Sequence, residues 1–71
     1  MNKAIVLHDR YNNEPIIIRT NAIKAVRKAF ELTENIEYSE VMIEALFISV
    51  TETIGEVIKK IKKAESEEQT E

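Results

Sequence analysis

Residues 46–61 change hydrophobic period part-way along, and this change constrains the fold more than any other feature of the sequence. From Leu46 to Val50 the apolar residues alternate, which is typical of a strand with one buried face. The next apolar residues follow the i, i+3, i+4, i+7 spacing of an amphipathic helix: Ile54, Val57, Ile58 and Ile61. The sequence therefore predicts a strand that leads directly into a helix, which runs from Thr53 to about Lys63.

The start of this helix carries the residue pattern of a capping box, Thr53-Ile54-Gly55-Glu56. In such a box the Thr53 hydroxyl accepts a hydrogen bond from the Glu56 amide, and the Glu56 carboxylate accepts one from the Thr53 amide. An amphipathic helix needs an apolar surface to cover. The preceding part of the chain is therefore expected to supply β-structure.

The N-terminal segment is predicted to form a β-hairpin. Ala4 to Leu7 is a compact apolar run, and residues 9–14 are polar and contain two adjacent asparagines, which tolerate positive φ. Pro15 lacks an N–H group and therefore suits the first residue of a strand. Residues 16–19 then return antiparallel to the first strand.

The middle of the chain leaves two alternatives open. In residues 20–32 the positions of Ile23, Val26 and Phe30 fit a helical period, whereas a strand would place Lys28 within its apolar face. The pattern alone favours a helix over this segment. Residues 36–45 are most simply another strand, with a helix beginning at Ser39 as the alternative.

The fold class predicted from these elements is α+β. A small, mainly antiparallel sheet of four or five strands, curled or partly closed, is covered by the C-terminal helix. Residues 1–63 form the single domain, and residues 64–71 are expected to be a disordered acidic tail. The predicted core comprises Ile5, Leu7, Ile16, Ile18, Val26, Phe30, Val41, Ile43, Leu46, Ile48, Val50, Ile54, Val57, Ile58 and Ile61.

Composition narrows the class of protein. A chain of 71 residues buries a limited core, and with no cysteine it has neither disulfides nor thiolate metal ligands to add stability. Association with another chain is one remaining source of buried area. The formal net charge of −3 does not favour binding of nucleic acid by bulk charge. No apolar run approaches the length of a membrane span and no secretory leader is evident, so we expect a cytoplasmic protein without a membrane partner.

Two stretches resemble the FlbD/SwrD-type family of small proteins, which comprises flagellar and swarming motility proteins and their bacterial and phage-borne relatives. They are residues 7–26, which contain Asn13-Glu14-Pro15-Ile16-Ile17-Ile18, and the closing Ile48-Ser49-Val50-Thr51-Glu52-Thr53-Ile54-Gly55-Glu56-Val57-Ile58. The resemblance implies that residues 23–32 form a third strand in a series of five, followed by one helix. It also implies an intracellular protein that is not an enzyme. The Asn-Gly turn that the family has near residues 43–46 is absent here.

No constellation of side chains predicts catalysis. His8 is the single histidine, and a metal or hydrolytic site needs several converging groups. The carboxylates considered as ligands have spacings that imply no shared cage: Asp9, Glu14, Glu37, Glu40 and Glu44. We therefore expect no enzyme activity, no metal, no cofactor and no small-molecule substrate.

The sequence instead favours a non-enzymatic interaction or assembly module that forms a homo-oligomer or binds a protein partner. Val6, Ile17 and Phe47 are expected on the second, less occupied face of the sheet, where they need a cover. The alternative is a nucleic-acid-binding regulator that uses a basic cluster of Arg19, Lys24, Arg27 and Lys28. On a helix the last three would share one face, but the sequence favours a solvated polar face as the explanation of these charges.

Overall fold

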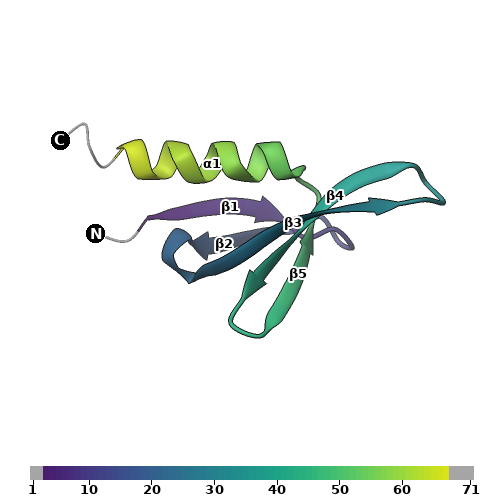
Figure 1. The fold of residues 1–71 in the computed structure, drawn as a ribbon, viewed down its shortest axis with the longest axis horizontal. Coiled ribbons are helices and arrows are strands. Elements are labelled where there is room, and N and C mark those ends of the chain that lie inside the picture. The colour runs from purple at the N-terminus through teal and green to yellow at the C-terminus, as the bar shows by residue number, and fades with distance from the viewer. Residues whose placement is uncertain (1–2, 68–71) are drawn as a thin grey trace.

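The computed structural model of the protein describes residues 3–67 and has five strands followed by one helix (Figure 1). The first hairpin consists of β1 (Ala4–His8) and β2 (Pro15–Arg19). A short 3-10 turn, η1 (Thr20–Ala22), leads into β3 (Ile23–Glu31), β4 (Ile36–Ile43) and β5 (Leu46–Val50). The chain ends in α1 (Ile54–Glu67), which lies alongside β1.

The strands form two antiparallel sheets, so the prediction of a single sheet is wrong, whereas the α+β class with a C-terminal helix is confirmed. β1 pairs with β2, and the second sheet has the order β3-β4-β5. The η1 turn separates β2 from β3, and these two strands do not pair. The sheets join where Asp9 bridges Val50: the Arg10 amide donates to the Ser49 carbonyl over 3.0 Å, and the Thr51 amide to the His8 carbonyl over 2.9 Å.

Each turn between paired strands contains a residue with positive φ that is not glycine. Asn13 has a φ of 61°, which confirms the hairpin turn predicted from the adjacent asparagines, and Asn35 has a φ of 59°. The β4–β5 turn has only Glu44 and Ala45 between the paired residues Ile43 and Leu46, and Glu44 has a φ of 57°. The turn thus forms without the Asn-Gly pair that usually marks such a connection.

Residues 23–31 form a strand, so the helix favoured by the pattern is wrong and the third strand implied by the family resemblance is present. β3 pairs with β4 along nearly its whole length, from Ile23 opposite Ile43 to Glu31 opposite Ile36. This pairing satisfies the backbone of β3 and places Val26 against the core. Long-range strand pairing therefore overrides a weak local helical preference.

The predicted capping box is confirmed at the start of α1. The Glu56 amide lies 3.3 Å from Thr53 Oγ1, and the Thr53 amide donates to Glu56 Oε1 over 2.9 Å. The helix continues to Glu67, past Lys63, where the prediction placed its end. Residues 68–71 of the predicted tail lie outside the described residues.

The core lies where α1 and the two sheets meet, and it is smaller than predicted. The buried apolar residues all belong to the predicted core: Ile5, Leu7, Ile18, Val41, Val50 and Val57. Partly buried residues packed against them are Ile16, Ile23, Val26, Ile43, Ile48, Ile61 and Ala64. Phe30, Leu46 and Ile58 were predicted to be buried and are exposed. Phe30 lies on the β3–β4 ribbon where it extends beyond α1, Leu46 directly follows the β4–β5 turn, and Ile58 lies on the flank of the helix.

Ser39 is fully buried on the core-facing side of β4, and within residues 3–67 its hydroxyl has no hydrogen-bond partner. A buried polar group without a partner destabilises the fold. We expect Ser39→Ala to raise the free energy of unfolding by about 1 kcal/mol, measured by urea denaturation. Ser49→Ala, which removes a partly exposed hydroxyl from β5, is the control and should change little. A loss of stability in Ser39→Ala would contradict the prediction.

Candidate functional site

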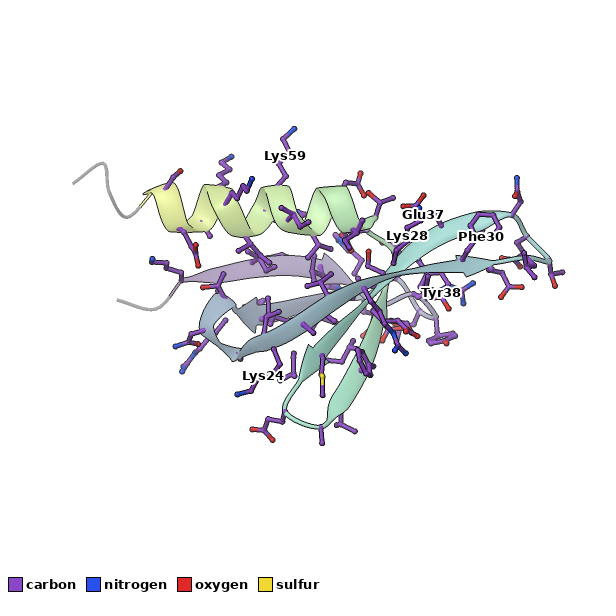
Figure 2. All side chains as sticks on the ribbon, viewed as in Figure 1. Lys24, Lys28, Phe30, Glu37, Tyr38 and Lys59 are labelled. Carbon is purple, nitrogen blue, oxygen red and sulfur yellow. The ribbon has the colours of Figure 1, made fainter. Side chains whose placement is uncertain are left out.

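The predicted basic cluster does not converge on one face. On β3, Arg27 lies opposite Glu40 and Lys28 opposite Ser39, so their side chains point to opposite sides of the sheet. Lys24 lies where the β3–β4 register is irregular, far along the strand from Lys28 (Figure 2). Arg19 ends β2, in the other sheet. The shared surface that a helix would have given these residues is absent because the segment is a strand.

Arginine side chains cover aromatic rings at two places. The Arg27 guanidinium lies 4.0 Å from the centre of the Phe47 ring and is held by Glu40, 2.6 Å from Arg27 Nε. Arg10 lies 4.2 Å from the centre of the Tyr38 ring and 3.6 Å from Glu31. These are cation–π contacts backed by ion pairs within the chain. They leave both arginines already engaged with groups of the same molecule.

The three apolar residues expected on an uncovered face lie on two different sheets. Val6 and Ile17 are cross-strand partners in the β1–β2 hairpin, on the side opposite Ile5 and Ile18, which are buried. Their exposed fractions are 41% and 74%. Phe47 lies on β5, where Arg27 covers its ring. Of these three residues, Val6 and Ile17 share one exposed surface, whereas Phe47, which is 42% exposed, lies on the other sheet.

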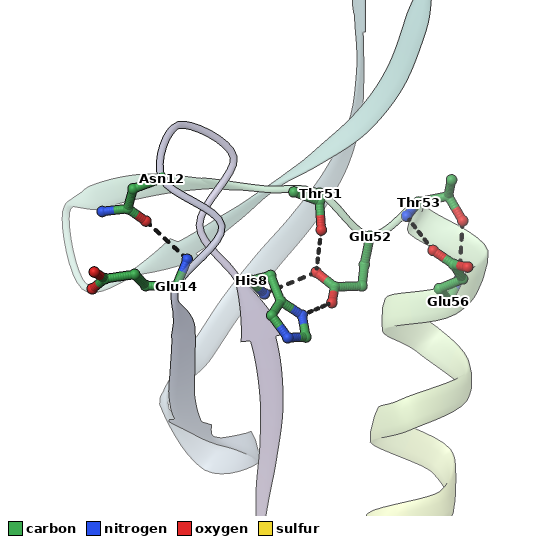
Figure 3. Close-up of polar contacts among 7 residues, drawn as sticks. All are labelled: His8, Asn12, Glu14, Thr51, Glu52, Thr53 and Glu56. Carbon is green, nitrogen blue, oxygen red and sulfur yellow. Dashed lines mark hydrogen bonds and ion pairs between the residues drawn. The ribbon is translucent and has the colours of Figure 1, made fainter.

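His8 and Glu52 form the most extensive polar contact that the structure describes (Figure 3). Glu52 Oε2 lies 2.7 Å from His8 Nδ1, and Glu52 Oε1 accepts a hydrogen bond from the His8 backbone amide over 3.0 Å. The Thr51 hydroxyl donates to the same oxygen over 3.4 Å. The His8 ring is partly exposed, as its place on the strand predicted, whereas Glu52 is only 8% exposed. These hydrogen bonds link the end of β1 to the segment between β5 and α1.

The environment of Glu52 stabilises its ionised form. Burial alone would raise the pKa of this carboxyl group. The hydrogen bonds from the His8 ring and amide and from the Glu52 backbone, together with the charge of His8, outweigh burial and lower the pKa below the ordinary glutamate value. Glu52 is therefore a structural carboxylate that stays ionised at neutral pH.

No local pattern in the sequence singles out Glu52. Its partner His8 lies 44 positions away, so no local spacing links them. One signal was available: Glu52 stands between the last residue of a buried strand and the N-cap of a helix, where a side chain is held close to the core. Among the described residues, the arrangement joins β1 to the segment between β5 and α1, and its third member is the Thr51 hydroxyl. Within residues 3–67, no three histidine or carboxylate side chains gather in a way that could hold a metal ion.

Comparisons with known proteins identify no relative. No protein-family model, no curated protein and no solved structure matches this chain. Among the described residues, no helix has the length and apolar character needed to cross a bilayer. The surface and contacts of the chain itself therefore carry the functional argument.

Proposed function

We propose that this chain is a non-enzymatic protein-interaction module that self-associates through the outer side of the β1–β2 hairpin. The observation that carries the proposal is the exposed pair Val6 and Ile17 in the middle of that hairpin. Among residues 3–67 only six apolar residues are buried, so covering two more would add substantially to the buried area of so small a domain.

The position of β2 supports the same conclusion. β2 pairs only with β1 and is therefore an edge strand of its sheet, and exposed apolar edge strands favour association. Pro15 and Arg19 at its two ends limit pairing, because proline lacks an N–H group and arginine carries a charge. We therefore place Ile17, midway between them, at the centre of the proposed contact between two copies of the chain.

In a symmetric dimer each residue contributes to the interface once from each chain, so one substitution changes the free energy of dimerisation twice over. Burying an isoleucine side chain stabilises an interface by about 2 kcal/mol, and threonine loses most of this contribution. Because both chains carry the change, Ile17→Thr weakens a symmetric interface by roughly 3 kcal/mol. We expect its dimer dissociation constant to rise about a hundredfold. Threonine is β-branched and should leave the exposed strand intact.

Sedimentation equilibrium across a micromolar to millimolar dilution series measures this effect. Leu32→Thr is the matched control, because Leu32 is exposed in the β3–β4 turn, away from the hairpin. We expect the wild type and Leu32→Thr to dimerise alike and Ile17→Thr to remain monomeric. A wild-type chain that is monomeric at millimolar concentration, or an Ile17→Thr variant that dimerises as well as the control, would overturn the proposal.

A further inference from the structure

A groove runs between α1 and the edge of β1 that faces away from β2. Its volume is about 230 Å³, and it is lined by Ala4, Ile5, Val6, Lys60, Lys63 and Ala64. A second hollow of about 460 Å³ is lined by the same two lysines and by Glu52, Glu56 and Lys59. The Lys59 side chain extends away from the sheets (Figure 2), whereas Lys60 and Lys63 line the groove beside β1.

The backbone of β1 has open hydrogen-bonding positions at this groove. The His8 amide donates to Glu52 and the His8 carbonyl accepts from the Thr51 amide, so both groups point away from β2. In an antiparallel strand every second residue directs its backbone groups to the same edge, which gives Val6 and Ala4 this direction too. Within residues 3–67 the structure pairs this edge at His8 but neither at Val6 nor at Ala4.

The charge of the groove indicates what kind of chain would fit. Lys60 and Lys63 lie on one flank of α1, beside the buried stripe that begins at Val57, and neither forms an ion pair with a described residue. The first position along this edge is already filled by a carboxylate, because Glu52 accepts the His8 amide hydrogen. Lys60 and Lys63 lie beside the positions that follow, and their positive charge favours acidic side chains there.

We propose that this groove binds an extended acidic segment of a partner protein, which adds to the free edge of β1 as a further strand. Its backbone pairs with Ala4 and Val6, and its carboxylates lie beside Lys60 and Lys63. A second copy paired through the same edge would bring two sets of these lysines together, so like charges oppose that occupant. The groove shares Val6 with the surface proposed for self-association but does not include Ile17. Strand addition uses the backbone of Val6, so it does not require that self-association.

The probe is a short, acetylated and amidated peptide of alternating glutamate and threonine, added to the full chain carrying Ile17→Thr. We expect saturable binding by fluorescence anisotropy, weakened by salt, and slower hydrogen exchange of the Ala4 and Val6 amides by NMR. The same peptide with N-methyl groups on alternate amides keeps the charge but cannot pair as a strand, and it should not bind. A peptide with lysine in place of glutamate should not bind either.

Two double variants with the same change in net charge separate the groove from general electrostatics. Lys60→Gln with Lys63→Gln should weaken binding roughly tenfold, because each exposed ion pair contributes up to about a fivefold effect. Lys24→Gln with Lys28→Gln, on β3, should bind like the parent chain. Equal binding of the N-methylated or the lysine peptide, equal losses in both double variants, or no slowing of exchange at Ala4 and Val6 would overturn the inference. Slowed exchange at these amides in the wild type without peptide, accompanied by dimer formation, would also overturn it, in favour of a second copy.

Discussion

Replacing Leu7 by alanine is expected to lower the free energy of unfolding by about 3 kcal/mol, within the range found for buried leucines. Leu7 has no exposed surface and lies in β1, in the cluster that both sheets and α1 contribute to. The substitution removes apolar contacts and leaves a cavity that the neighbouring strands fill only in part. A small domain has a total stability of only several kcal/mol, so this loss is a large share of it.

The effect is measured as a fall in Tm of roughly 15 °C, by circular dichroism. Leu46→Ala is the matched control, because Leu46 is 71% exposed beside the β4–β5 turn. The sequence alone predicts both leucines to be core residues, whereas the structure predicts a loss for Leu7 and almost none for Leu46. Similar falls in Tm for the two variants would contradict the packing described here.

Glu52→Gln is expected to lower the free energy of unfolding by about 2 kcal/mol at neutral pH, the size of a charge-assisted hydrogen-bond contribution. The glutamine amide still offers one oxygen, but its NH₂ group replaces an acceptor at one of the two positions that meet His8. Glu14→Gln, on an exposed turn residue, is the control for loss of one negative charge and should change the stability by less than about 0.5 kcal/mol. Urea denaturation distinguishes the two variants.

The pH dependence of stability tests the same contact. The pKa of Glu52 is lower in the folded chain than its ordinary value, so the folded state binds the proton more weakly than the unfolded state does. The resulting stabilisation is fully present above the ordinary glutamate pKa and is lost as the pH falls through the lowered, folded-state pKa. We therefore expect the difference between wild type and Glu52→Gln to shrink in acid. A difference that stays constant into the acid range would show that the charge of Glu52 is not its source.

The elements best predicted from the sequence are those whose signals are local. The strand at 46–50, the capping box at Thr53 and the asparagine turn at Asn13 each depend on neighbouring residues, and each is confirmed. Residues 23–31 show the limit of such signals, because the pairing partner that makes them a strand is β4. The separation of β2 from β3 likewise depends on the change of chain direction at η1. The hydrophobic pattern of the sequence does not predict this change of direction.

The candidate surfaces were predictable in part. Alternation along β1 and β2 correctly places Val6 and Ile17 away from the buried side of the hairpin. It does not reveal that Arg27 covers Phe47, because that contact joins β3 to β5 across the intervening β4. Nor does it reveal the His8–Glu52 contact, whose members come together only when both sheets and the helix have assembled.

The turns of this chain also affect the state from which it folds. Three positions with positive φ are occupied by Asn13, Asn35 and Glu44, and the whole sequence contains a single glycine. Glycine samples more backbone conformations than any other residue, so a chain that avoids it has less conformational entropy to lose on folding. At these three positions the gain is offset by the cost of a left-handed backbone on a residue with a Cβ, a cost that asparagine tolerates better than Glu44 does. Neither effect is visible among the contacts of the small core.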